Sequence, residues 1–140
     1  MLAALKARET LLADGEQKRR RLLWREAFER RFLEQLPGSE LVGAGAERLW
    51  NTVSALMPEA DCQQRWVVKL DKLGFAVSTG SACASGREEA SHVLAAMGYG
   101  AGEAGRVLRF SSGWETAEQE WSSLLQGLIR VREAMAPVAS

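Results

Sequence analysis

The sequence has little of what several protein classes require. It contains two cysteines, one histidine and three prolines among 140 residues. Two thiols are too few for the disulfide framework of a small secreted protein. Cys62, Cys83 and His92 do not have the spacing of zinc ligands, so we expect no metal site.

Long apolar runs and an excess of either charge are also missing. No stretch of about 18 apolar residues occurs, so we expect no membrane span, and residues 1–18 lack the apolar core of a secretory signal. Eighteen Lys and Arg balance eighteen Asp and Glu, which gives no argument for binding nucleic acid or an anionic membrane. We therefore expect a cytoplasmic protein with neither kind of partner.

The hydrophobic pattern predicts alternating helices and short strands. A helix is expected over 1–36, where leucine and phenylalanine recur at spacings of three, four and seven, with a possible break at 14–15 and an end at 37–38. Strands are predicted over 39–42, 49–57, 75–78 and 107–111. Further helices are predicted over 61–74, around 93–97 and from 116 onward. This order is typical of a two-layer α+β fold in which helices cover a small sheet.

Four consecutive basic residues, Lys18 to Arg21, allow two interpretations. They could form a nucleic-acid patch, or they could lie on a solvated helix face. Acidic residues nearby favour the solvated face: Glu16, Glu26, Glu29 and Glu34.

Cys83 is the candidate nucleophile. It lies in a loop of small residues between Gly80 and Gly86, which would leave the thiol accessible. A helix is predicted to start just after it, capped by Ser85 or Ser91, and the positive end of a helix lowers a thiol pKa. The alternative is a small cysteine packed in a turn.

The other two candidates for metal or catalytic chemistry are weaker. Cys62 lies at a predicted helix start without a nearby base, so we expect it only to fill space. His92 lies in the first turn of a predicted helix, where a capped or solvated side chain is expected.

Arg109 is the candidate binding residue. Leu108 and Phe110 flank it in a predicted strand, so they should point to one face of a sheet and Arg109 to the other. A guanidinium at the end of a strand can bind a carboxylate through two parallel hydrogen bonds. The alternative is an exposed strand arginine without a partner.

Residues 75–113, FAVSTGSACASGREEASHVLAAMGYGAGEAGRVLRFSSG, resemble the C-terminal domain of NifS-like cysteine desulfurases of the class V aminotransferase family. The shared motifs occur in order: a Ser-Thr-Gly-Ser-Ala-Cys loop ending at Cys83, Ser-His-Val-Leu from Ser91, Arg-Phe-Ser-x-Gly from Arg109, and a Thr-x-x-Glu-type helix start at Thr116. Residues 48–53 match the family's Pro-Asn-x-x-Asn strand region more loosely. The resemblance covers about residues 37–135.

This resemblance implies a fold and an activity. The fold would be the C-terminal small domain of fold-type I pyridoxal-phosphate enzymes, a mainly antiparallel sheet covered by helices, at 37–140 after a linking helix at 1–36. The enzyme would convert L-cysteine to L-alanine. Cys83 would carry the removed sulfur as a persulfide for an acceptor protein, as in iron–sulfur cluster assembly, and Arg109 would bind the substrate carboxylate. The complete enzyme would be a homodimer.

The family's large domain, which holds pyridoxal phosphate, has no counterpart in the sequence. The four lysines lie outside the family's Ser-x-His-Lys motif: Lys6, Lys18, Lys69 and Lys72. We therefore expect no cofactor on this chain alone and no activity from it without a large domain. A standalone sulfur carrier or interaction module and an inactive remnant of the enzyme are the alternatives.

Overall fold

The computed structural model describes residues 15–59, 65–79 and 91–135. Five helices lie in these ranges: α2 (Gly15–Gln35), α3 (Arg65–Lys72), α4 (His92–Ala96), α5 (Ala101–Ala104) and α6 (Glu118–Glu133). Four strands accompany them: β1 (Glu40–Leu41), β2 (Thr52–Leu56), β3 (Ser78–Thr79) and β4 (Val107–Ser111). Cys62, Cys83 and Lys6 lie outside the described residues.

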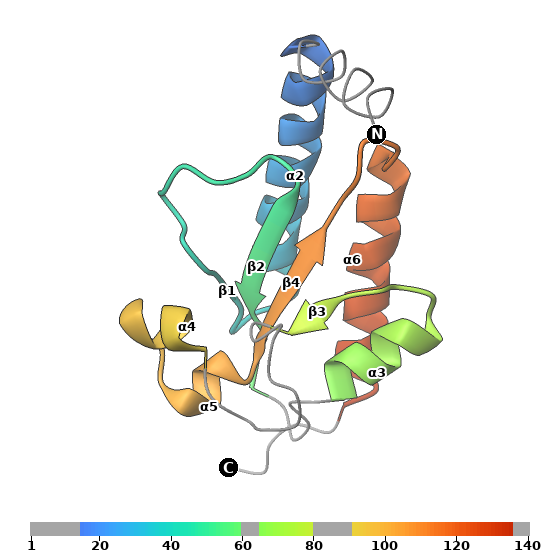
Figure 1. Cartoon of the computed structure of the whole chain (residues 1–140). Coiled ribbons are helices and arrows are strands. Elements are labelled where there is room, and N and C mark those ends of the chain that lie inside the picture. Colours follow the sequence, from blue (N-terminus) through green and yellow to red (C-terminus); the bar gives the residue numbers. More distant parts are fainter. Residues whose placement is uncertain (1–14, 60–64, 80–90, 136–140) are drawn as a thin grey trace, which may run out of the picture.

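The strands form one sheet in the order β1-β2-β4-β3 (Figure 1). All three neighbouring pairs are antiparallel, and β2 and β4 form the longest pairing, from Thr52 opposite Ser111 to Leu56 opposite Val107. The prediction of an α+β fold with a mainly antiparallel sheet is therefore confirmed.

Helices α2 and α6 pack side by side against one face of this sheet, and α3 packs against α6 (Figure 1). The core between them is aromatic: the Phe28 ring lies 5.8 Å from that of Phe32, 5.9 Å from that of Phe110 and 4.8 Å from that of Trp121. Leu108, the other inward residue of β4, is also buried here. Aromatic packing of this kind contributes more than its buried area alone.

The opposite face of the sheet is covered only in part. Short helices α4 and α5 place Leu94 and Ala104 against a small apolar cluster made with Val107 of β4 and with Val42 and Leu56. The rest of this face carries polar side chains of β2 and β4. The sheet thus has one apolar face and one mixed face.

Several predicted boundaries differ from the structure. Strand β2 begins at Thr52 rather than 49, because an arginine of α2 binds the main chain of Leu49. Strand β3 begins at Ser78 rather than 75, because the Phe75 side chain packs on the helix layer. Helix α5 was not predicted, since its Ala-Gly-Glu-Ala sequence reads as a glycine-rich turn.

Helix α2 ends at Gln35 as the Pro37-Gly38 pair predicts, and Gly38 has a φ of 84°. None of the described helices is long and apolar enough to cross a membrane.

Candidate functional site

Arg109 lies on the mixed face of the sheet. Its neighbours Leu108 and Phe110 are buried in the aromatic core, while Arg109 itself is half-buried, so the predicted alternation is present. Arg109 pairs with Ser54 of β2 and with Ser78 of β3. Arg109 is therefore part of a central strand, and the strands on both sides fix the position of that strand.

A hollow of about 430 Å³ opens on this face. The sheet, the start of α4 and the segment that follows β1 line it together. The lining residues are Val42, Gly43, Arg48, Leu49, Thr52, Ser54, Ser91, Val93, Leu94, Met97, Val107 and Arg109.

The charged side chains of this hollow are both cationic. Among the described lining residues Arg48 and Arg109 carry charge, and no carboxylate is present. Arg48 donates two hydrogen bonds of 2.9 Å to Glu29. Within the described part of the chain, the Arg109 guanidinium has no hydrogen-bond or ion-pair partner, so it is available to bind an anion.

The segment that contains Cys83 lies outside the described residues, but the residues that flank it are described. The described residues on either side of it are Thr79 and Ser91. Thr79 pairs with Leu108, next to Arg109, and Ser91 lines the hollow. Ser91 also caps α4 by accepting a hydrogen bond from Leu94 N at 3.5 Å, as predicted for one of the two candidate serines.

The described lysines do not fit a pyridoxal-phosphate site. Lys18 and Lys72 are exposed on helices, and Lys69 Nζ donates to the Ala134 carbonyl at 3.5 Å. None of the three lines the hollow that contains Arg109. His92 is exposed at the first residue of α4.

The solvated face predicted for Lys18 to Arg21 is only partly correct. Lys18, Arg19 and Arg20 are exposed, and Arg20 pairs with Glu16 at 3.6 Å. Arg21 instead donates to the carbonyl of Trp114 and to Gln17. Its Cζ lies 5.9 and 5.3 Å from the ring centroids of Trp50 and Trp114, which is cation–π distance.

Sequence reasoning also missed the role of Glu29. It was assigned to the solvated face, but its side chain is only 8% exposed and pairs with Arg25 as well as Arg48. The available signal was an Arg-Glu pair four residues apart, with Glu29 next to Phe28 on the apolar side of the helix.

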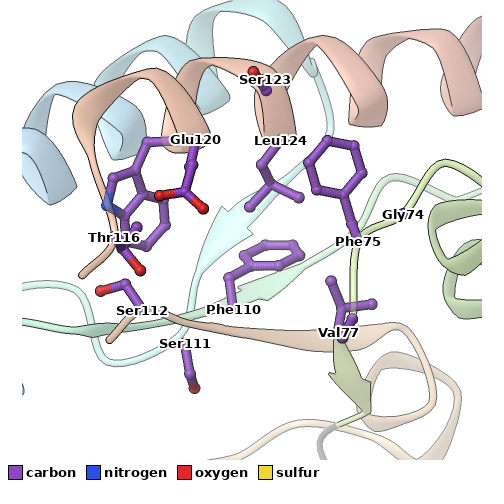
Figure 2. A pocket seen from close by; sticks show the side chains of 12 residues that line it. Gly74, Phe75, Val77, Phe110, Ser111, Ser112, Thr116, Glu120, Ser123 and Leu124 are labelled. Carbon is purple, nitrogen blue, oxygen red and sulfur yellow. The ribbon is translucent and has the colours of Figure 1, made fainter. Parts of the chain in front are cut away.

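A second hollow, of about 280 Å³, lies on the helix-covered side of β4 (Figure 2). Aromatic and aliphatic side chains form much of it, with Glu120 and Thr116 at the polar end. Those polar groups already bind the chain: Glu120 accepts from Ala117 N at 2.7 Å and Thr116 Oγ1 accepts from Gly113 N at 2.9 Å. They stabilise the turn before α6, so the hollow at Arg109 is the better candidate site.

Solved structures share this arrangement. The X-ray structure of a NifS-like protein from Rickettsia africae aligns with a TM-score of 0.71 at 24% identity, over 85% of this chain and 30% of that one. Another NifS-like protein gives a TM-score of 0.69 at 21% identity, over 86% and 29%. The chain therefore has the fold of part of a NifS-like protein.

Sequence relatives name the family. A cysteine desulfurase of Rhodobacter capsulatus is 39% identical over 103 residues, which are 74% of this chain and 27% of that protein. Cysteine desulfurase 2 of Trichormus variabilis is 31% identical over 139 residues, which are 99% of this chain and 35% of that protein. No family model matches. The chain belongs to the NifS-like cysteine desulfurases, and it spans about a quarter to a third of the length of these relatives.

Proposed function

We propose that this chain supplies the substrate-binding arginine and the sulfur-carrying thiol of a cysteine desulfurase. Residues 37–140 would form its small domain and residues 1–36 the helix that links it to a large domain. Because the described lysines do not fit pyridoxal phosphate, the cofactor would be held by the rest of the enzyme. The complete enzyme would be a cytoplasmic homodimer that passes sulfur to an acceptor protein.

One observation carries this proposal: the two described residues that flank the segment of Cys83 lie at the strand and at the hollow of Arg109. Thr79 is paired with the residue next to Arg109, and Ser91 shares its hollow. Cys83 is four positions after Thr79, a reach of at most about 14 Å for an extended chain. That reach would allow the Cys83 thiol to approach a substrate held by Arg109.

The chemistry assigns one task to each residue. The Arg109 guanidinium would hold the carboxylate of L-cysteine by two parallel hydrogen bonds, which fixes both position and orientation. The Cys83 thiolate would then attack the substrate sulfur. A sulfur–sulfur bond forms, the carbon–sulfur bond breaks, and its electron pair and a proton pass to the carbon. The products are L-alanine and a Cys83 persulfide, so no external oxidant is needed.

The test uses the complete enzyme that contains this chain. Cys83→Ala should abolish the persulfide detected by mass spectrometry after incubation with cysteine, while Cys62→Ala should leave it unchanged. Arg109→Ala should weaken cysteine binding by about 1.5–3 kcal/mol, the usual value of a charged hydrogen bond. Arg130→Ala, at an exposed position of α6, is the matched control.

Two results would contradict the assignment. A persulfide that forms without Cys83 would remove the carrier role. An Arg109→Ala enzyme with unchanged affinity for cysteine would remove the carboxylate-binding role.

A further inference from the structure

One wall of the hollow includes Arg48, which belongs to a largely buried ion cluster of two arginines and one glutamate. Arg48 donates two hydrogen bonds of 2.9 Å to the two carboxylate oxygens of Glu29, and Arg25 Nε lies 3.4 Å from Glu29 Oε1. The side chains of Arg25, Glu29 and Arg48 are 7%, 8% and 20% exposed. Removing charges from water is costly, and apolar residues often replace such clusters without loss of stability. The burial of this cluster is therefore weak evidence for a role in stability.

The cluster holds the wall of the hollow. Arg25 Nη1 donates to the Leu49 carbonyl at 2.5 Å, while Glu29 holds the Arg48 side chain. Arg48 and Leu49 both line the hollow, on the segment that leads into β2. Helix α2 thus fixes this wall through one main-chain contact and one side-chain contact.

The same contacts determine which arginine of the hollow is available to bind a ligand. Both terminal nitrogens of Arg48 donate to Glu29, so they are not free to bind a ligand. Arg109 has no such partner among the described residues. With Glu29 in place, Arg109 is the one guanidinium among the described lining residues whose terminal nitrogens are not engaged. Without Glu29, the hollow would offer two such groups, an arrangement that suits a ligand with two carboxylates.

We propose that Glu29 is a positioning residue that makes the hollow selective for amino acids with one carboxylate. It does so by holding Arg48 against α2 and away from the ligand of Arg109. The proposal rests on the proposed function, because it takes Arg109 as the carboxylate-binding group.

A first experiment needs no substitution. The arginine side-chain signals of the isotope-labelled 140-residue chain are followed by NMR during titration with acetate and, separately, with malonate. The Arg109 signal should shift with both anions, and the Arg48 signal should stay in place. If the Arg48 signal shifts together with that of Arg109, the role of Glu29 is overturned, but the carboxylate-binding role of Arg109 is not. No shift at Arg109 would overturn this proposal and the carboxylate-binding role together.

A second experiment tests the dependence on Arg48. In Glu29→Gln the affinity for malonate relative to acetate should rise roughly tenfold, the effect of about 1.4 kcal/mol from one added charged contact. Arg48→Met alone should keep the wild-type ratio. The double variant Glu29→Gln/Arg48→Met should also keep it, because the second cation is gone.

These variants separate selectivity from a merely structural role. A ratio that does not rise in Glu29→Gln, or one that stays high in the double variant, would overturn the proposal. Circular dichroism checks that each variant is folded. If Glu29→Gln does not fold, the wild-type titration decides the question.

Discussion

The two faces of the sheet differ in what they bury. The face under α2 and α6 is covered by aromatic and aliphatic side chains, whereas the face toward α4 and α5 keeps hydroxyls and Arg109 around a hollow. Strand β4 serves both, since Leu108 and Phe110 point to the first face and Arg109 to the second. If Arg109 binds the ligand as proposed, alternate residues of one strand serve stability and ligand binding, and substitutions should separate the two.

The largest expected effect is on the face under α2 and α6. Phe32 is fully buried against Phe28 and Phe110, so Phe32→Ala should lower the free energy of unfolding by about 3–5 kcal/mol. Leu33→Ala, one residue along the same helix but 43% exposed, is the control and should change it far less. Urea denaturation followed by tryptophan fluorescence measures both.

Arg109→Ala belongs in the same series. On the mixed face it should change stability by no more than about 0.5 kcal/mol, as for an ordinary surface substitution. A loss as large as that of Phe32→Ala would show that the two faces are not separable.

A smaller effect is expected where α6 meets the segment before β3. A Cβ on Gly127 would lie 2.7 Å from Cε2 of the Phe75 ring, too close for the ring to stay in place. Overpacking costs about 1–3 kcal/mol, and the better helix propensity of alanine returns about 1 kcal/mol. Gly127→Ala should therefore lower the melting temperature modestly.

Gly102→Ala is the matched control for that change, since its Cβ would meet nothing within 4 Å. It should leave the melting temperature unchanged or raise it. Adding Phe75→Leu to Gly127→Ala should recover part of the loss, and a double variant no better than Gly127→Ala would show that the Phe75 ring is not the obstacle.

The smallest expected effect concerns Tyr99, which lies between α4 and α5 on the mixed face of the sheet. Tyr99 donates a hydrogen bond of 2.7 Å to Glu40, and this bond, with some burial and the charges of Glu40 and Glu103, raises the pKa of Tyr99 to about 12. Folding thus favours the neutral phenol. The resulting stabilisation is complete below the ordinary pKa of about 10 and is lost as the pH rises through about 12.

Tyr99 is the single tyrosine of the chain, so its ionisation can be followed by ultraviolet absorbance without interference from another phenol. Glu40→Ala should move the midpoint down toward 10, and Glu103→Gln should move it less. A Tyr99 titration midpoint near 10 in the unmodified chain would show that the hydrogen bond from Tyr99 to Glu40 of β1 is absent.

Much of this fold follows from local pattern. Strand β4 was predicted over its observed range because apolar residues alternate around Arg109, and the same alternation gave the face of that side chain. The final helix followed from its acidic first turn and apolar stripe. These features depend on neighbours in sequence, which a single chain displays.

What was missed depends on contacts between distant segments. Nothing near Glu29 in the sequence shows that Arg48 will reach it, so a buried ion cluster was taken for part of a solvated face. The late start of β2 has the same origin, because Arg25 of α2 holds the Leu49 carbonyl. The hollow itself is a product of such contacts, since residues from four separate stretches form its walls.

The pairing of β4 with both neighbours also limits where this chain can gain or lose residues. Length changes in the turns before Arg106 or after Ser112 leave the side of the sheet that carries the guanidinium unchanged. One residue inserted between Val107 and Arg109 would exchange the two rows of side chains and direct a cation at the rings of Phe28 and Phe32. Insertions are thus tolerable in the turns. Within the strand the number of residues is fixed, because successive side chains point to opposite faces of the sheet.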